Sequence, residues 1–343
     1  MATPKRPARS AKPAIPAPPA RLARPRYLLG ILSRKRSLYT TSRLMEAATR
    51  LGHRAVVLDT LRCNLVLERG HPAVFYNGHS VVKVGAVLPR IGASITSYGL
   101  AVVNQFEMMG VPVANTSLAI SRSRDKLRCL QLLASHGLDI PRTVMARDRT
   151  GLEQAVDQIG GLPAIIKLIQ GTQGVGVMIA HTIEEIQTIL DTFWNLGQEI
   201  LLQEFIAESK GADIRALVVG DRVVGAMRRK AKAGEFRSNI HRGGQGMVVE
   251  LTPEYERTAV KAAKVMGLEI AGVDMLESGT GPKIMEVNSS PGFEGLEAAT
   301  GLDIAQLIMQ HVIALADAGR AGSQAGTAAP REASATISRR VDE

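Results

Sequence analysis

The chain has 343 residues, 45% of them hydrophobic but only 3% aromatic, which suits two or three compact units of an aliphatic α/β protein. Its formal net charge of +10 would suit a nucleic-acid-binding protein, but seven of those ten charges fall in residues 1–26. No run of about 18 apolar residues is present, which excludes a transmembrane helix. The two isolated cysteines, Cys63 and Cys129, exclude a disulfide scaffold and indicate a cytoplasmic protein.

The first 26 residues are rich in proline, alanine, lysine and arginine, a composition that cannot bury enough apolar surface to fold. They also lack the continuous apolar run of a secretory signal. We therefore expect a disordered basic extension that could contact RNA or the ribosome, although an extension without function explains the composition equally well.

Residues 27–115 have the alternation of a small doubly wound domain. Apolar strands over residues 27–33 and 55–59, with an amphipathic helix between them, form a β-α-β unit, which implies a parallel sheet with a right-handed crossover. The Asn77-Gly78 pair predicts a type I′ hairpin turn, and residues 87–92 end a further strand.

A second unit is expected to begin with two helical segments. The pattern turns helical at Thr116 and stops at Gly137, and Asp125 is a candidate cap for its second half. A strand, a helix and another strand are then expected over residues 143–146, 152–159 and 164–168.

The stretch from residue 164 to 180 combines an apolar strand bearing Lys167, a loop with Gly171, Gly174 and Gly176, and a second apolar strand. Glycines let backbone N–H groups approach phosphate oxygens closely, and a lysine could reach the same charge. The order of a Walker loop is absent. The pattern is typical of a phosphate-covering hairpin, although ordinary tight turns give the same pattern.

Two later strands carry polar groups. The strand EILLQEFI ends in Gln203, Glu204 and Phe205, which could hold a purine edge, although strand ends are commonly polar. The next strand places Asp213 and Arg215 on one face, because side chains alternate between the two faces of a sheet.

Basic side chains gather between Arg228 and His241. This segment is a solvated loop by default, but it would also neutralise phosphates or carboxylates. A lone histidine in such a loop is more often structural than a proton acceptor. A helix over residues 252–267, capped by Thr252, follows, and the last helix is expected to span residues 303–318 before a disordered tail.

Residues 271–288 are predicted to form a β-hairpin with one carboxylate in each strand. A symmetric register would place Asp274 opposite Glu286, and Asn288 shares a face with Glu286. Two carboxylates about 4 Å apart repel by roughly 4 kcal/mol at an effective dielectric constant of about 20. Such a pair needs a proton, a basic partner or a cation, and an oxygen set of this kind suits Mg²⁺ or Mn²⁺. Two solvent-facing acids on an edge hairpin are the simpler alternative.

Taken in this order, the segments make the chain resemble the ATP-grasp ligases, and more narrowly the RimK-type glutamate ligases. The resemblance runs from about residue 27 to residue 316 and rests on ILSR at 31–34, PRIG at 89–92, NQFEMMG at 104–110, RDKLRCLQLLA at 124–134, KLIQGTQGVGV at 167–177, GADIRALVVGD at 211–221, EFRSNIHRGG at 235–244, AGVDML at 271–276 and MEVNSSPGFEG at 285–295.

The fold that this resemblance implies is an α/β (α+β) ATP-grasp fold. It would comprise an N-terminal doubly wound parallel-sheet domain at 27–115 and two α+β subdomains, 116–205 and 206–318, that clasp ATP. The basic extension at 1–26 and a disordered tail at 319–343 would flank them.

The resemblance also implies roles for individual residues. Lys126 and Lys167 would contact the ATP phosphates, and Arg215 would lie near the transferred phosphate, so that Lys167 and Arg215 are the candidate catalytic residues. Further nucleotide-site residues would be Glu204, the backbone of Phe205, Asp213, Arg237, Ser238 and Asn239. Two Mg²⁺ or Mn²⁺ ions would be held by Asp274, Glu286 and Asn288, with Glu286 shared between them.

The activity implied by the resemblance is ATP-dependent addition of L-glutamate to the C terminus of a small-subunit ribosomal protein through an acyl phosphate, in a dimer or tetramer. Gln170 and Ala233 are uncharged where the family pattern leads us to expect charge, which bears on the substrate side. Two alternatives stay open. One is a ligase that joins glutamate to a small molecule, a carrier protein or free glutamate, and the other is a nucleotide-sensing regulator that binds RNA or ribosomes.

Overall fold

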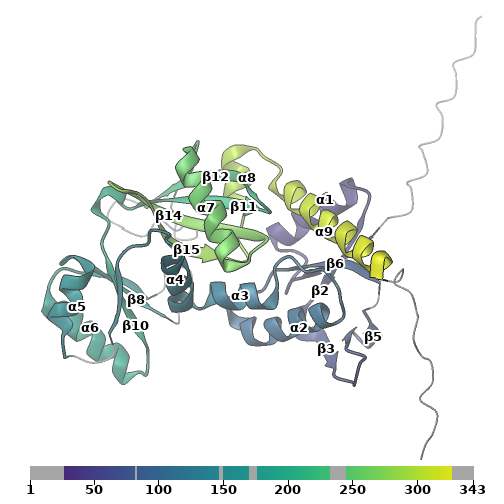
Figure 1. Ribbon diagram of the computed structural model, residues 1–343, viewed down its shortest axis with the longest axis horizontal. Helices are drawn as coiled ribbons and strands as arrows, with labels where there is room; N and C mark the ends of the chain where they lie inside the picture. The colour runs from purple at the N-terminus through teal and green to yellow at the C-terminus, as the bar shows by residue number, and fades with distance from the viewer. Residues whose placement is uncertain (1–26, 82, 147–149, 170–175, 232–244, 327–343) are drawn as a thin grey trace, which may run out of the picture.

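The computed structural model describes residues 27–81, 83–146, 150–169, 176–231 and 245–326. Figure 1 shows three sheets of appreciable size with helices packed on them: a parallel sheet on the right, a five-stranded sheet above the centre and a four-stranded sheet on the left. Within the described residues, short 3-10 turns occur at Thr60–Arg62, Ala93–Ile95 and Ala207–Ser209.

The N-terminal sheet is parallel, in the strand order β2-β1-β6, as the sequence predicted. Its strands are β1 (Leu28–Leu32), β2 (Arg54–Leu58) and β6 (Val84–Pro89). Helices α1 (Tyr39–Arg50) and α9 (Ile304–Gly326) share one core with it, and α2 (Thr96–Met108) shares another.

A small antiparallel sheet of β3 (Cys63–Val66), β4 (Ala73–Tyr76) and β5 (His79–Ser80) extends this domain. The turn between β4 and β5 has positive φ angles at both Asn77 (51°) and Gly78 (81°). Two successive positive φ angles define a type I′ turn, so that prediction is confirmed.

Two short helices, α3 (Ser117–Arg124) and α4 (Lys126–Ser135), lie between the parallel sheet and the four-stranded sheet (Figure 1). Asp125 is the one residue between them, and its side chain accepts a hydrogen bond from the backbone N–H of Arg128 at 2.9 Å. It therefore caps α4, as predicted.

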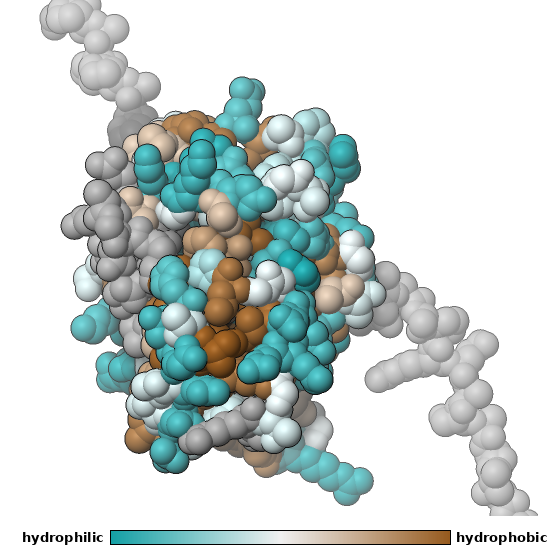
Figure 2. All heavy atoms as spheres, turned by 90° about the vertical axis from the view of Figure 1, so that its left-hand side faces the viewer, coloured by the Kyte–Doolittle hydropathy of each residue, from teal (hydrophilic) through white to brown (hydrophobic). Residues whose placement is uncertain are grey.

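The four-stranded antiparallel sheet has the order β7-β10-β8-β9. Its strands are β7 (Thr143–Ala146), β8 (Ala164–Leu168), β9 (Val177–Ala180) and β10 (Ile200–Glu204), and α5 (Leu152–Ile159) and α6 (Ile183–Asn195) share its core. Figure 2 faces this end of the molecule and shows apolar side chains gathered at its centre. Leu162 and Leu196, in loops of this unit, are exposed.

The five-stranded antiparallel sheet has the order β13-β12-β11-β14-β15. Its strands are β11 (Ala212–Val219), β12 (Arg222–Lys230), β13 (Gln245–Val248), β14 (Ile270–Ser278) and β15 (Gly281–Asn288). Helix α7 (Pro253–Met266) shares a core with this sheet, and α8 (Glu294–Thr300) connects β15 to α9.

The structure differs from the sequence predictions at three places. The last helix does not end at residue 318 but continues to Gly326, and at Gly319 it packs against Pro112 so closely that a Cβ there would lie 2.5 Å from the proline ring. Thr252 precedes α7, but its side chain makes no capping hydrogen bond. Arg228, Arg229 and Lys230 are not in a solvated loop, because β12 extends through Lys230 and pairs with β11 on one side and β13 on the other.

Asn115 joins the N-terminal domain to the five-stranded sheet. Its buried side-chain amide donates to the carbonyl oxygens of Ile270 and Ser289, both at 2.8 Å, and its oxygen accepts from the N–H groups of Glu269 and Ile270 at 2.7 and 2.9 Å. These four hydrogen bonds fix the start of β14 and the segment after β15 to the same residue.

Within the described ranges, no single helix is long and apolar enough to cross a membrane. Helices α8 and α9 meet those criteria only as a pair, with a bend of 119° between them. Their apolar side chains, including Leu296, Ile304 and Ile308, belong to the protein core.

Candidate active site

The two hairpin carboxylates are cross-strand neighbours, as the sequence predicted. The turn at Gly279-Thr280 pairs Ser278 with Gly281, and this register alone would place Asp274 opposite Met285. A register shift between Asp274 and Met275 instead places Asp274 opposite Glu286. The irregularity thus aims both acids at one point of the sheet.

Asp274 is buried and is held by two arginines. The Nε and Nη2 atoms of Arg215 donate to its two carboxylate oxygens at 2.7 and 2.6 Å, and Nη2 of Arg229 donates to Oδ2 at 3.0 Å. Burial alone would raise the pKa of Asp274, but the two guanidinium groups outweigh it and hold that pKa below its usual value.

Arg229 extends this arrangement to a second buried acid, Asp213, to which it donates two hydrogen bonds at 2.6 and 2.7 Å. Asp213 and Arg215 do share the face that the period of two predicted, since both join the same chain of charges. Sequence analysis placed Arg229 in a solvated loop by default and did not single it out, although neutralising carboxylates was the alternative given for that segment. The alternation of charged residues along β11 was the available signal for a basic partner on a neighbouring strand.

Glu286 is in the opposite electrostatic situation. Its side chain is open to solvent, yet the surrounding protein removes part of its hydration and Asp274 repels it, and both effects raise the pKa of its carboxyl group. Arg215, Lys167 and Lys126 oppose this shift. The positive charges around Glu286 are therefore too few to stabilise its ionised form fully.

The two predicted lysines lie within the electrostatic field of Glu286. Lys126, at the start of α4, donates from Nζ to the carbonyl oxygen of Leu168 at 2.8 Å, and desolvation lowers its pKa. Desolvation also lowers the pKa of Lys167, on β8, to about 8, with Glu286 opposing this change and Lys126 adding to it. The structure thus gathers cations from α4 and β8 against an acid on β15.

The donor chemistry suits a divalent cation. Asp274, Glu286 and Asn288 supply two carboxylates and an amide, the hard oxygen ligands that Mg²⁺ and Mn²⁺ prefer, and the Asn288 amide nitrogen lies 3.5 Å from Oδ2 of Asp274. In the part of the chain that the structure describes, no cluster of three or more His, Cys, Asp and Glu side chains forms a metal site. A cation here would compete with Arg215 and Arg229 for the oxygens of Asp274. Glu286, which lacks such partners, is the most available ligand.

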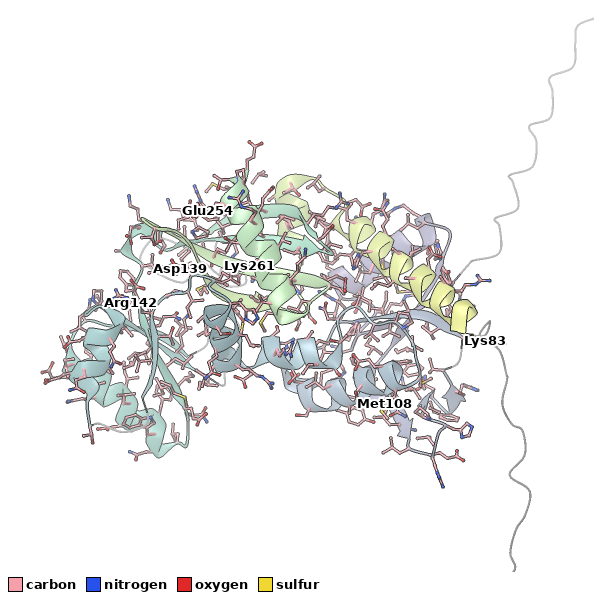
Figure 3. All side chains as sticks on the ribbon, viewed as in Figure 1. Lys83, Met108, Asp139, Arg142, Glu254 and Lys261 are labelled. Carbon is pink, nitrogen blue, oxygen red and sulfur yellow. The ribbon has the colours of Figure 1, made fainter. Side chains whose placement is uncertain are left out.

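Glu204, at the end of β10, is held by Arg142. Its carboxylate accepts hydrogen bonds from the backbone N–H and Nη2 of Arg142, both at 3.0 Å, and Lys283 lies 3.8 Å away. Burial would raise the pKa of Glu204, but the hydrogen bonds from Arg142 lower it overall. Lys283 also pairs with Asp139 at 3.2 Å, so that Arg142 contacts Glu204 directly and Asp139 contacts its neighbour Lys283; Figure 3 labels Asp139 and Arg142.

The remaining sequence-predicted residues divide into two groups. Phe205 follows Glu204 directly and is partly buried. Arg237, Ser238 and Asn239, as well as the glycine-rich segment at 170–175, lie outside the described residues.

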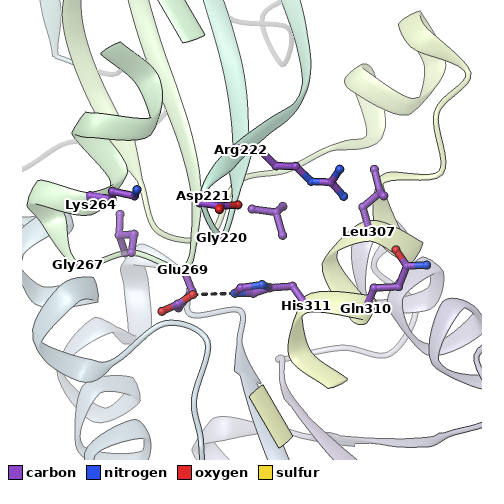
Figure 4. Close-up of a pocket in the computed structure, with 11 residues that line it drawn as sticks. Gly220, Asp221, Arg222, Lys264, Gly267, Glu269, Leu307, Gln310 and His311 are labelled. Carbon is purple, nitrogen blue, oxygen red and sulfur yellow. Dashed lines mark hydrogen bonds and ion pairs between the residues drawn. The ribbon is translucent and has the colours of Figure 1, made fainter. Parts of the chain in front are cut away.

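A separate pocket of about 570 Å³ lies at the other end of β11 (Figure 4). Val219, in its lining, is six residue steps along β11 from Asp213, a path of about 20 Å. Inside it a ring nitrogen of His311 lies 2.7 Å from the carboxylate of Glu269, and the hydrogen bond between them lowers the pKa of Glu269. None of the sequence-predicted site residues that the structure describes lines this pocket.

Solved structures with the same architecture define the class of protein. The ATP-grasp ligase PsnB, complexed with a minimal precursor, matches with a TM-score of 0.69 and 22% identity over 84% of this chain and 99% of that one. The D-alanine–D-alanine ligase of Bacillus anthracis, complexed with ATP, matches with a TM-score of 0.63 and 18% identity over 87% of this chain and 99% of that one. The fold is therefore that of the ATP-grasp ligases.

Family models and curated relatives narrow this class. The RimK pre-ATP-grasp domain matches residues 28–120 and the RimK-like ATP-grasp domain matches residues 123–312. Probable alpha-L-glutamate ligase 1 of Hahella chejuensis is 54% identical over 83% of this chain and 94% of its own length, and the probable alpha-L-glutamate ligase of Vibrio cholerae is 51% identical over the same shares. The chain belongs to the RimK-like ATP-grasp family and is an ATP-dependent carboxylate–amine ligase.

Proposed function

We propose that this protein is an alpha-L-glutamate ligase that uses ATP to add L-glutamate to the C terminus of a small-subunit ribosomal protein in the cytoplasm. The observation that carries the proposal is the meeting of Asp274 and Glu286 with Lys126 and Lys167 on an ATP-grasp fold. The names of the relatives at 50–54% identity support glutamate as the amino acid.

The lysines and the hairpin acids divide the work of binding nucleotide. Lys126 and Lys167 would neutralise the ATP phosphates, and Glu204 with the backbone of Phe205 would receive the adenine. Asp274, Glu286 and Asn288 would hold Mg²⁺ or Mn²⁺, which supplies charge neutralisation for the triphosphate. Arg215, fixed by Asp274, is then positioned to face the transferred phosphate.

The reaction requires activation because a carboxylate resists attack by an amine. An oxygen of the acceptor carboxylate attacks the γ-phosphorus of ATP, the bond from that phosphorus to the bridging oxygen breaks, and ADP leaves. The glutamate nitrogen then attacks the acyl carbon, the bond to phosphate breaks, and the nitrogen releases a proton to water. The protein contributes positioning and positive charge rather than a covalent nucleophile.

The decisive experiment incubates the purified protein with ATP, Mg²⁺, L-glutamate and the candidate ribosomal protein, and measures the acceptor by mass spectrometry. Successive additions of a glutamate residue at the C terminus, with equivalent ADP release, are expected. An acceptor of unchanged mass contradicts the proposal. ADP release that persists without the ribosomal protein would instead favour ligation to a small molecule or to free glutamate.

The lowered pKa of Lys167 predicts a pH dependence of nucleotide binding. Above its pKa of about 8, the lysine must take up a proton when phosphate binds, so the affinity for ATP and for ADP should fall by up to about tenfold per pH unit. The stability of the unliganded protein should change in the opposite sense. Unfolded lysine keeps its proton to about pH 10.5, so stability rises with pH between these two values.

This prediction is measured as the dissociation constant of ADP by titration calorimetry from about pH 7 to about pH 10. Lys167→Arg is the matched variant, since a guanidinium stays protonated throughout that range. The wild-type affinity should decline more steeply with pH than that of the variant. Parallel curves would show that Lys167 does not carry the titrating charge.

A further inference from the structure

Besides Lys126 and Lys167, two arginines, Arg90 and Arg124, form a second group of positive charges near the segment that follows β15. Arg90 follows β6, and its Nη2 donates to the carbonyl oxygen of Pro291 at 2.6 Å. Arg124, at the end of α3, donates to the carbonyl oxygen of Ile91, the neighbour of Arg90. Both contacts are to neutral backbone oxygens, so neither guanidinium gains an opposite charge from them.

The surroundings leave this charge largely uncompensated. Among the described residues, neither Arg90 nor Arg124 has a carboxylate within ion-pair distance, whereas Arg43, Arg215 and Arg229 do. Burial, together with the nearby charge of Arg124, lowers the pKa of Arg90 to about 10. Burying like charges together is unfavourable unless an anion joins them.

Hydrogen-bonding groups around these arginines also lack partners. Within the described part of the chain, Nε of Arg124 and the hydroxyl oxygens of Ser289 and Ser290 are buried and make no hydrogen bond. The residue Ser289 is only 3% exposed, and its backbone oxygen is fixed by Asn115 at 2.8 Å. Donors without acceptors on an anchored segment are a feature of a prepared anion site.

The location indicates which anion belongs there. Arg90 lies just beyond the carboxyl end of β6, the edge where open parallel sheets bind ligands. The serines follow Asn288 directly, and the charge of Arg124 interacts with Glu286. The lysines proposed for the phosphates come instead from β8 and the start of α4. An anion bound by Arg90 and Arg124 would thus lie on the side of the β14–β15 hairpin that faces the N-terminal domain.

We propose that Arg90, Arg124, Ser289 and Ser290 form the site for a carboxylate of the incoming amino acid. The inference rests on the proposed function and adds the residues that recognise the amino acid. The guanidinium groups and hydroxyls donate to the carboxylate, which leaves the amine free to face the activated acceptor. Either carboxylate of glutamate, the α-carboxylate or that of the side chain, has this chemistry.

The test uses the full-length enzyme and varies L-glutamate at saturating ATP and acceptor. Arg124→Gln should raise the KM for glutamate about tenfold to a hundredfold, the range for a lost hydrogen bond between charged groups, and Ser290→Ala should raise it severalfold. The KM for ATP should change by less than about twofold, because the phosphates bind elsewhere. Arg69→Gln removes an exposed arginine of the same domain and should change neither constant.

Two analogues of glutamate, its α-amide and glutamine, show which of its two carboxylates binds at this site. If Arg124 binds the α-carboxylate, the variant should lose most of the wild-type discrimination against the α-amide of glutamate. If it binds the side-chain carboxylate, the variant should lose discrimination against glutamine. Either result supports the site.

The inference is overturned if the KM for glutamate is unchanged in both Arg124→Gln and Ser290→Ala, or if the KM for ATP rises as much as that for glutamate. Should Arg124→Gln fail to fold, the double variant Ser289→Ala/Ser290→Ala decides in its place. Failure of the proposed function has a different signature, because the wild-type enzyme would then show no ADP release that depends on glutamate.

Discussion

Glu286→Gln is expected to lower the rate of ADP release at least about a thousandfold, equivalent to about 4 kcal/mol of lost transition-state stabilisation. The substitution preserves volume but removes the negative charge that a bound cation needs. The fold should not suffer, because the pKa of Glu286 is raised by desolvation and by repulsion from Asp274. A neutral side chain relieves both effects, so the melting temperature should stay the same or rise.

Glu277→Gln is the matched control for this substitution. Glu277 lies on the same hairpin, but it pairs with Arg228 at 2.6 Å and is partly exposed, so its replacement should leave turnover close to wild type. Activity would be followed by ADP release at several Mg²⁺ concentrations and stability by thermal denaturation. Wild-type turnover by Glu286→Gln at ordinary Mg²⁺ would refute the role of Glu286 as a metal ligand.

Arg229→Met is expected to destabilise the folded protein by about 3–5 kcal/mol, the usual cost of removing one partner from a buried ion pair. The side chain of Arg229 is only 3% exposed, and its loss takes two hydrogen bonds from Asp213 and one from Asp274. Both acids keep their buried charge while losing a cation. The melting temperature should fall by roughly 6–20 °C, at the 2–4 °C per kcal/mol typical of domains of about 150–250 residues.

A double-mutant cycle separates this electrostatic cost from lost packing. Arg229→Met combined with Asp213→Asn should be less destabilised than the sum of the two single variants, because the second change removes one of the buried charges. Arg222→Met, at an exposed position of the same strand, should change stability by less than about 0.5 kcal/mol. Equal losses in Arg229→Met and Arg222→Met would contradict the role of the buried network.

Local signals in the sequence were sufficient for much of the fold. The Asn77-Gly78 turn, the cap at Asp125 and the pairing of Asp274 with Glu286 each follow from a few neighbouring residues whose backbone preferences agree. The pairing nevertheless depends on a register shift that sequence symmetry does not reveal. The right residues face each other because the strand accommodates Met285 as an additional residue.

Contacts between segments that are distant in the chain could not be predicted from the sequence. Arg229 looks like part of a basic loop until β12 is seen to lie between β11 and β13, where one face of the strand is buried. Arg90 and Arg124 are separated in sequence and meet only when α3 packs beside the end of β6. In each case, the charge is visible in the sequence, but the neighbour that gives it a role comes from tertiary packing.

The four hydrogen bonds of Asn115 have a consequence for how the enzyme can move. They bind the hairpin of β14 and β15 to the N-terminal domain, and α9 strengthens the connection because it shares one core with β1, β6 and the five-stranded sheet. We therefore expect these parts to move together. Any closure over a nucleotide would then be a movement of the four-stranded sheet about the chain segments beside Arg142 and Glu204.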